Sequence, residues 1–441
     1  MTLTPKFELS QNDEFIIIKI RVPFVKISST EIYIEDCNFT FYCKPYLLKM
    51  KLPFPIIDDE RCKSIIDLQE ENGTVTCFVP KLNVGQFFPE LDMFTKLLSL
   101  RTKEDKLTNK NLLPSIEVLS SEYSNSDICD DTNLKEEESL LTCIENLSLL
   151  SKPLYGFDLK YNGIFENLRE VFYDLIELPY PDSTPIEKRK NLRIESENEL
   201  FDVERYLADL YHIKDDYIYN ESINYIPYWS KYWEIWKSGS KEKSESDIEW
   251  FTPKEIEIMQ QKLPRREYLV DKNNYHAILL GLVDILFSYC YDHRFNQGDK
   301  NVESAHNISR LSALLSWLEH YQGSDSIQSV IKNNVRRSLI YPYIRNYKFA
   351  CKILVDVSKL VILGKKSILK ALINIHSIFE SSETHYILNK IYLDDYCCWI
   401  QQINEETLIN FGKAYNLEKS KLNKSVLGLS LDDIEKCSDA V

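Results

Sequence analysis

The chain has 441 residues, 44% of them hydrophobic and 27% charged, which is enough for about two or three globular domains with sizeable cores. It carries 53 Lys and Arg against 68 Asp and Glu, and the net charge of −15 disfavours direct binding to nucleic acid, since phosphate contacts usually need a positive surface. No two of its 11 glycines are closer together than Gly156 and Gly163, which excludes the Gly-rich dinucleotide fingerprint, the Walker P-loop and the G-x-S-x-G elbow.

Metal, thiol and membrane sites are not indicated either. The 11 cysteines include no C-x-x-C pair and the 7 histidines include no H-x-x-x-H pair, which are spacings that let ligands converge on one metal ion. No apolar run approaches the ~20 residues that a bilayer-spanning helix needs, and residues 1–10 are too polar for a signal peptide. We therefore expect no metal, no cofactor and no membrane contact, and a reducing compartment such as the cytosol or nucleus.

Residues 1–100 are predicted to form an antiparallel β-sandwich. Short runs rich in Ile, Val, Phe, Tyr and Thr are separated there by turn-forming and charged residues. In residues 31–35 and 46–52, polar and apolar residues alternate, which predicts one buried and one solvated face. Strands are expected at residues 7–10, 15–22, 31–35, 39–44, 46–52 and 74–80. A short helix within residues 91–100 is expected to end this domain.

Residues 101–150 are predicted to be a flexible acidic linker. They carry 5 Lys and Arg against 11 Asp and Glu, including the run Glu136, Glu137 and Glu138. The segment could bind a partner as an acidic tail, but the favoured interpretation is that it solvates and spaces two domains.

From residue 151 the hydrophobic period changes from 2 to 3.6, which predicts an all-helical domain over residues 151–418, followed by a polar tail at 419–441. A first apolar stripe predicts a helix over residues 164–176. Residues 252–255 combine a capping box with a proline in the first turn, so a helix should begin there. The stripe over residues 275–290 has small residues on its opposite flank, so this helix should be central. Further helices are expected around residues 311–318, 349–363, 368–379 and 407–415.

Two features could carry chemistry or bind bases, and each has a structural alternative. Asp284 interrupts the apolar stripe of the central helix, and a buried carboxylate with a raised pKa can act as a general acid. A hydroxyl or an arginine from a neighbouring helix could instead satisfy it, which is the favoured interpretation, and no catalytic residue is assigned. An aromatic cluster could stack bases, although its helical spacing favours a packing ridge. The cluster consists of Tyr225, Tyr228, Trp229, Tyr232, Trp233 and Trp236.

An arginine- and tyrosine-rich segment spans residues 336–345. Its candidate partner-binding residues are Arg336, Arg337, Tyr341 and Arg345. The guanidinium groups could grip carboxylates on a partner protein or phosphates on RNA. They could equally tie helices together by bonding carbonyls and internal acids, and the sequence leaves both possibilities open.

Charge is divided unevenly within the helical domain. Residues 151–260 carry 14 Lys and Arg against 23 Asp and Glu, whereas residues 261–441 carry 23 against 20. The acidic half could oppose a strongly basic partner, although a solvated surface is the simpler interpretation. Asp202, Glu204 and Asp209 are the candidate partner contacts in this half.

Ordered motifs run along nearly the whole chain, except for the linker and the residues after about 417. They are LTPKF at 3–7, YCKPYLL at 42–48, YGF at 155–157, RYLAD at 205–209, LGLVDIL at 280–286, KNVESA at 300–305, RRSLIYP at 336–342 and DYCCWIQ at 395–401. Together they resemble the SHQ family of H/ACA ribonucleoprotein assembly chaperones. One departure is His306, which follows KNVESA where the family often has an aromatic residue, so a contact there is not carried over.

The resemblance implies a CS domain, which is a seven-stranded co-chaperone-like sandwich, joined to a family-specific α-helical domain. It also implies a non-enzymatic role in the nucleus and cytoplasm. The chain would hold a newly made dyskerin-type pseudouridine synthase at its RNA-binding surface, as an RNA mimic, until H/ACA particles assemble. We expect no direct contact with nucleic acid and a monomer when the chain is free.

Other hypotheses stay open on the sequence alone. The sandwich by itself suggests an adaptor of the ninety-kilodalton heat-shock chaperone, because a fold does not fix a function. An enzyme of unrecognised type would use Asp284 or Glu303. Direct RNA binding by the helical domain is opposed by the net charge.

Overall fold

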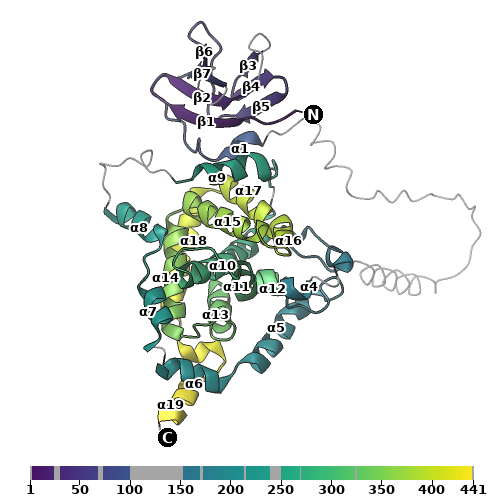
Figure 1. Ribbon diagram of the computed structural model, residues 1–441, viewed down its shortest axis with the longest axis vertical. Coiled ribbons are helices and arrows are strands. Elements are labelled where there is room, and N and C mark those ends of the chain that lie inside the picture. Colours follow the sequence, from purple (N-terminus) through teal and green to yellow (C-terminus); the bar gives the residue numbers. More distant parts are fainter. Residues whose placement is uncertain are drawn as a thin grey trace, which may run out of the picture.

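The computed structural model describes residues 2–23, 30–67, 73–99, 152–168, 172–212, 215–238, 250–268, 270–322 and 325–439. Within these residues a β-sandwich sits on one end of a larger helical domain (Figure 1). The predicted fold class, an antiparallel β-sandwich followed by an α-helical domain, is confirmed. The predicted linker at 101–150 lies outside the described residues.

The sandwich consists of two antiparallel sheets, one with strand order β1-β2-β7-β6 and the other with β3-β4-β5. Its strands are β1 (Lys6–Gln11), β2 (Phe15–Arg21), β3 (Glu31–Glu35), β4 (Asn38–Cys43), β5 (Tyr46–Lys51), β6 (Lys63–Asp67) and β7 (Thr74–Pro80). Alternate residues such as Ile16, Ile18 and Ile20 of β2 are buried, as the period of 2 predicts. The six predicted strands are confirmed. The sequence missed β6 because this edge strand is mostly exposed and its hydrophobic pattern is weak.

Helix α10 (Lys272–Phe295) runs through the middle of the helical domain, with helices on all sides (Figure 1). The small residue Gly281 is what lets two neighbours come close. A Cβ atom at this position would lie 2.5 Å from the hydroxyl of Tyr396 and 3.2 Å from a methyl group of Leu314. The predicted central role of this helix and of its small flank is therefore confirmed.

Most of the other predicted helices are also present. The capping box at Thr252 forms and begins α9, although the helix expected around 311–318 is split by Ser312, which caps α12. The remaining α-helices are α5 (Ile186–Leu200), α6 (Val203–His212), α7 (Tyr217–Asn224), α8 (Tyr228–Ser238), α9 (Pro253–Glu257), α11 (Ser304–Leu311), α12 (Ala313–Trp317), α13 (Ile327–Ser338), α14 (Tyr347–Ile362), α15 (Lys365–Glu380), α16 (Tyr386–Leu388), α17 (Asp394–Gln402) and α18 (Glu405–Ser420). Of the helices that the structure describes, none has the length and apolar character to cross a bilayer.

Two predictions about the helical domain need correction. In place of one helix over 164–176, the described residues form a 3₁₀ turn, η3 (Phe165–Asn167), and the short α4 (Phe172–Leu175). After α4 the backbone N–H of Glu177 donates to the carbonyl of Ser316 (2.8 Å), so a tertiary contact holds the chain where this short helix ends.

The predicted polar tail is likewise part of the folded domain. A 3₁₀ turn, η8 (Lys424–Leu427), and α19 (Leu431–Asp439) follow α18. Leu427, Leu429 and Leu431 are buried, and the Tyr206 hydroxyl of α6 donates to Glu435 of α19 (2.5 Å). The spacing of these leucines was the sequence signal for the end of the domain.

The sandwich docks through β1 and α1 (Phe94–Leu98) on the π-helical turn η6 (Ile258–Lys262) and on α17. The side-chain amide of Gln260 donates to the carbonyl of Phe7 (2.7 Å) and accepts from its N–H (3.4 Å). The carboxylate of Glu90 lies between Lys96 and Lys365, with both ion pairs at 2.5 Å. These paired contacts fix the orientation of one domain on the other.

Candidate functional site

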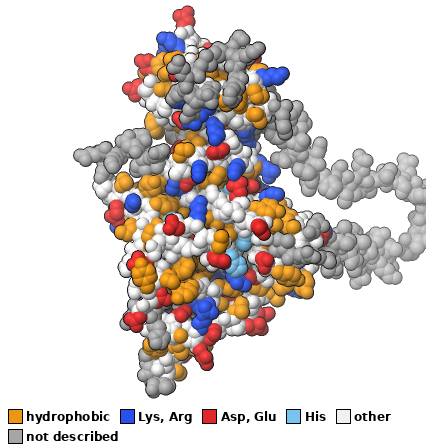
Figure 2. All heavy atoms as spheres, viewed as in Figure 1, with side chains coloured by type: hydrophobic (Ala, Val, Ile, Leu, Met, Phe, Trp, Pro, Cys, Tyr) orange, Lys and Arg blue, Asp and Glu red, His pale blue; other side chains and the backbone are white. Residues whose placement is uncertain are grey.

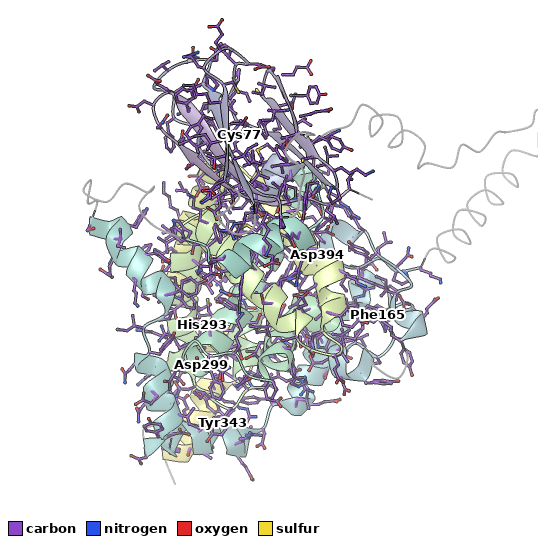
Figure 3. All side chains as sticks on the ribbon, turned by 45° about the horizontal axis from the view of Figure 1, so that its top comes forward. Cys77, Phe165, His293, Asp299, Tyr343 and Asp394 are labelled. Carbon is purple, nitrogen blue, oxygen red and sulfur yellow. The ribbon has the colours of Figure 1, made fainter. Side chains whose placement is uncertain are left out.

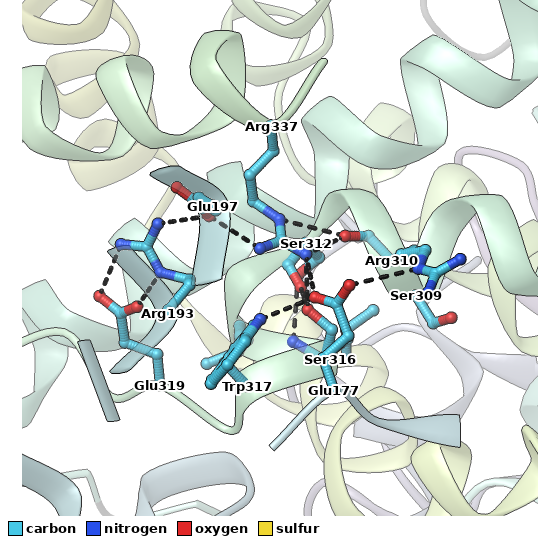
Figure 4. Close-up of polar contacts among 12 residues, drawn as sticks. Glu177, Arg193, Glu197, Ser309, Arg310, Ser312, Ser316, Trp317, Glu319 and Arg337 are labelled. Carbon is cyan, nitrogen blue, oxygen red and sulfur yellow. Dashed lines mark hydrogen bonds and ion pairs between the residues drawn. The ribbon is translucent and has the colours of Figure 1, made fainter. Parts of the chain in front are cut away.

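Arg337 lies inside the helical domain, near the end of α13 (Figure 4). This side chain has 0% exposure, and its guanidinium group donates to Glu177 (2.6 Å) and to Glu197 (2.9 Å). The neighbouring Arg336 donates to the other carboxylate oxygen of Glu197 (2.8 Å) and to the carbonyl of Leu427 (3.2 Å). Both guanidinium groups therefore bind acids and carbonyls of this chain.

Glu197 of α5 is the centre of this network. Arg193 donates to Glu197 (2.7 Å) and to Glu319 (2.5 Å), and Figure 4 shows Arg193 and Arg337 bonded to the same Glu197. With Arg336, three arginines surround this carboxylate. Burial by itself would raise the pKa of Glu197, but the charges of Arg193 and Arg337 outweigh it and lower the pKa. The network joins α5, α12 and α13 from within.

The candidate partner contacts in residues 336–345 are corrected by this geometry. The side chain of Arg345 is also buried, and its Nε donates to the carbonyl of Ile340 (2.8 Å). The half-buried ring of Tyr341 lies 4.5 Å from the Arg337 guanidinium carbon. Of the two possibilities that the sequence left open, the observed contacts are those of structural ties. Arg336, Arg337 and Arg345 are not available on the surface, because burial has removed them from solvent.

Asp284 of α10 has 0% exposure, and one of its oxygens has no hydrogen-bond partner among the described residues. The other oxygen accepts from the Ser312 hydroxyl (2.5 Å) and from the N–H of Leu314 (2.9 Å), so the favoured prediction of a neighbouring hydroxyl partner is confirmed. Loss of water raises the pKa of Asp284 to about 6. Glu303, the other candidate acid, is exposed just before α11. The two side chains thus occupy different environments, and their positions do not suggest an acid–base pair.

We expect Asp284 to make the stability of the fold depend on pH. Its pKa of about 6 in the folded chain exceeds the ordinary value of about 3.9, so the folded state holds this proton more tightly. The resulting stabilisation is complete below about pH 4 and is lost as the pH rises through about 6. Asp284→Asn should remove this dependence, so wild type should lose up to about 3 kcal/mol relative to the variant between pH 4 and pH 7. Urea unfolding at both pH values tests this, and an unchanged difference would contradict it.

The aromatic cluster divides into a buried and an exposed part. Trp229 of α8 has 0% exposure and packs against His293 of α10, with ring centroids 4.8 Å apart. Trp233 and Trp236 stack on one another at 4.9 Å, and Trp236 remains 55% exposed. The buried part around Trp229 is a packing ridge, which is the interpretation that the sequence favoured.

The three candidate acids in residues 202–209 lie along α6, at the end of the helical domain that is farthest from the sandwich (Figure 1). Asp202 and Glu204 are exposed, and Asp202 accepts from the N–H of Arg205 (3.1 Å). Asp209 is half-buried, and one of its oxygens has no hydrogen-bond partner among the described residues. Loss of water raises the pKa of Asp209, and the charge of Asp216 raises it further, against the opposing effect of Arg205.

The structure adds residues from α7 and from the loop before α14 to these acids. Asp216 caps α7 by accepting from the N–H of Tyr219 (3.1 Å), and it also accepts from the hydroxyl of Tyr343 (3.3 Å). The charge of Asp216 is the main cause that raises the pKa of Tyr343. Tyr217 is 74% exposed and Tyr343 is 54% exposed. We call the surface formed by these groups the acid–tyrosine surface. It consists of Asp209, Asp216, Tyr217 and Tyr343.

Many other acids of residues 151–260 are neutralised within the chain. Glu255 pairs with Lys370 (2.9 Å), and Glu177 and Glu197 pair with the buried arginines. The exposed acids of the described residues are spread over η3, α4, α5, α6 and α7, and Asp209 lies close enough to Asp216 for that charge to raise its pKa. Figure 2 shows acidic side chains alternating with hydrophobic ones over the α6 end of the molecule, and Figure 3 labels Tyr343 there.

Sequence reasoning identified Asp202, Glu204 and Asp209 as candidates but missed Asp216, Tyr217 and Tyr343. The doublet Asp215 and Asp216 before an aromatic stretch was a signal for a helix cap, whereas the approach of Tyr343 required the tertiary fold. Within the described stretches, no group of three or more His, Cys, Asp or Glu side chains is placed to hold a metal ion.

Comparison with known proteins identifies both domains. Residues 4–98 match a family model described as "SHQ1-like, CS domain", and residues 240–431 match one described as "SHQ1 protein, Shq1 domain". The "Protein SHQ1 homolog" of Xenopus tropicalis is 34% identical over 440 residues, which cover 100% of this chain and 70% of that relative. The chain belongs to the SHQ1 family. The resemblance found in the motifs is thereby confirmed.

Other SHQ1 relatives align over the same span. The homologue of Danio rerio is 35% identical over 99% of this chain and 71% of its own length, and "Protein shq1" of Schizosaccharomyces pombe is 32% identical over 98% and 96%. The CS match ends at residue 98, the last residue of α1, so this docking helix belongs to the matched region. The acid–tyrosine surface is mostly contributed by residues before 240, outside the SHQ1-domain model but inside the full-length alignments.

Proposed function

We propose that this SHQ1-family protein is an assembly chaperone for box H/ACA ribonucleoproteins, which binds a dyskerin-type pseudouridine synthase at its RNA-binding surface before RNA arrives. The observation that supports it most is the acid–tyrosine surface. Carboxylates at Asp209 and Asp216 stand beside exposed rings at Tyr217 and Tyr343. An RNA-binding surface offers cations for phosphates and platforms for bases, so acids and aromatic rings can occupy both kinds of subsite.

The proposal includes a physical reason for the chaperone role. A basic RNA-binding surface that is left empty attracts other polyanions and promotes aggregation, and an acidic protein surface can cover it until the RNA competes. The proposed activity is non-enzymatic, needs no cofactor and takes place in the nucleus and cytoplasm, with a monomeric free chain.

Competition with RNA tests the mimicry directly. The full chain and the synthase of the same organism are co-purified, and H/ACA guide RNA is then titrated into the complex. We expect the RNA to displace the chain as its concentration rises, and the affinity of the protein complex to fall with added salt. A stable complex that contains both the RNA and this chain would contradict the mimicry, while leaving binding to the synthase intact.

A second candidate function is that of an adaptor for the ninety-kilodalton heat-shock chaperone. One observation favours it: the segment after β7 exposes Leu82, Val84 and Phe87 at 49%, 62% and 66%. Saturable binding of the chaperone to the full chain, abolished when these three residues are replaced with serine, would support this alternative. Binding of the synthase alone would leave the first proposal in place.

A further inference from the structure

A cavity of about 540 Å³ lies where the sandwich meets the helical domain. Its size is in the range of sites that hold a few side chains of a ligand. Both domains contribute to its walls, and all of its charged lining residues are cationic. The lining consists of Thr2, Leu3, Thr4, Pro5, Lys6, Arg21, Pro23, Tyr46, Gln261 and Arg265.

Two motifs of the sequence form one wall of this cavity. The LTPKF stretch pairs with the start of β5, because Leu3 donates to the carbonyl of Pro45 and accepts from the N–H of Leu47, both at 2.9 Å. From the helical side, Gln260 holds Phe7 by both of its backbone groups. The cavity is therefore preformed by backbone hydrogen bonds in the described residues and needs no ordering of its walls on binding.

The cations of the cavity are incompletely balanced. Lys6 and Arg21 stand opposite each other in β1 and β2, where like charges repel. Lys6 pairs with Glu257 (3.0 Å) and Arg21 pairs with Glu8 (2.8 Å), so both have acid partners.

Arg265 is the cation that lacks a carboxylate partner among the described residues. Its guanidinium group donates to the hydroxyl of Thr4, and its side chain reaches the open part of the cavity. Loss of water lowers the pKa of Arg265, and no acid offsets that effect. A guanidinium group without an acid partner would be stabilised by a ligand carboxylate, which it can bind through two parallel hydrogen bonds.

We propose that this cavity binds an acidic peptide segment of a protein partner, with a carboxylate at Arg265 and an apolar side chain against Leu3 and Tyr46. The apolar part of the wall is exposed, since Leu3 is 52% accessible. A long polyanion such as RNA fits less well, because the described walls of the cavity offer only three cations and two of them already pair with acids of this chain, whereas a polynucleotide carries a charge at every phosphate. The cavity lies at the junction of the two domains and the acid–tyrosine surface lies at the far end of the helical domain, so this binding does not depend on the proposed function (Figure 1).

The test uses the full chain and a fluorescent peptide of alternating Asp and Leu, with a matched peptide of alternating Asn and Leu. We expect saturable binding of the acidic peptide only. Arg265→Gln should weaken it about tenfold, as expected for the loss of one charge-assisted contact. Arg266→Gln is the matched control, because Arg266 is exposed at the next position but does not line the cavity. Equal weakening by both variants, or no binding to the wild type, would overturn the proposal.

A further variant separates ligand binding from a loosened domain junction. Thr4→Val removes the internal partner of Arg265 and keeps the shape of the residue, so Arg265 should bind the peptide at least as tightly as in wild type. If Thr4→Val weakened binding as much as Arg265→Gln does, the effect would come from the junction and the proposal would fail. An oligouridylate that bound more tightly than the peptide would likewise overturn it, in favour of a phosphate site for nucleic acid.

Discussion

Glu197→Gln is expected to lower the free energy of unfolding of the helical domain by about 3 kcal/mol, because it leaves buried arginines without their shared acid. The carboxylate has 0% exposure and accepts hydrogen bonds from Arg193, Arg336 and Arg337. Glutamine keeps the shape but offers a single acceptor oxygen, and its amide hydrogens would face guanidinium donors. Urea unfolding followed by circular dichroism at neutral pH measures the change.

The same helix provides a control for this substitution. Glu195 and Glu199 are exposed on α5, two residues before and after Glu197, so Glu195→Gln and Glu199→Gln should change stability by less than about 0.5 kcal/mol. Equal and small effects at all three positions would show that the network does not stabilise the domain. If apolar residues replaced the whole network and stability were restored, the prediction would still hold. The free energy of unfolding falls because a buried charge is left unpaired, and the full replacement leaves no such charge.

The parts of the fold that the sequence predicted are those in which local pattern and burial agree. The alternation in β5 and the apolar stripe of α10 each repeat along the element, so a period of 2 or 3.6 is evident in the sequence. The strand β6 was missed because one face of an edge strand need not be apolar. The helix expected over 164–176 is replaced by a short turn and a short helix, for which the apolar stripe alone gave no signal.

The pairings of the buried arginines could not be predicted from the sequence. The residues around an arginine do not show whether its side chain is buried against an acid or exposed to solvent. Arg336 meets Glu197 across 139 residues and Arg337 meets Glu177 across 160. The domain junction is similar, since Gln260 and Phe7 pair across 253 residues through backbone groups. Pairings of this kind depend on the tertiary fold and leave no local periodicity.

For the candidate site, the net charge of residues 151–260 overstated the acidic surface. The count over residues 151–260 includes Glu177 and Glu197, which the buried arginines neutralise. Asp209 and Asp216 are outside these buried pairs, and they lie close enough for the charge of Asp216 to raise the pKa of Asp209. A count of charged residues can therefore define an interface only after the buried and paired residues have been removed from it.

Removing the two charges at the centre of the acid–tyrosine surface is expected to weaken binding of the synthase by about 10- to 100-fold. The double variant Asp209→Asn with Asp216→Asn suits this test, because asparagine is as good a helix cap as aspartate and α7 should keep its start. The loss should shrink with added salt, since salt screens the attraction that the wild type uses. Binding is measured at low and at physiological ionic strength.

The control must change the net charge equally at another place. Asp58→Asn with Glu60→Gln does so on exposed positions of the sandwich, far from α6, and should change the affinity little. If both double variants weakened binding alike, only the overall charge would matter and the acid–tyrosine surface would not be the contact. If only the double variant of Asp209 and Asp216 weakened binding, Tyr217→Ala should add a further loss of affinity that salt does not remove. An exposed ring contributes through stacking and apolar contact, which salt does not screen. A salt-sensitive effect of the acids combined with a salt-insensitive effect of Tyr217 is the pattern that mimicry of phosphate and base together requires.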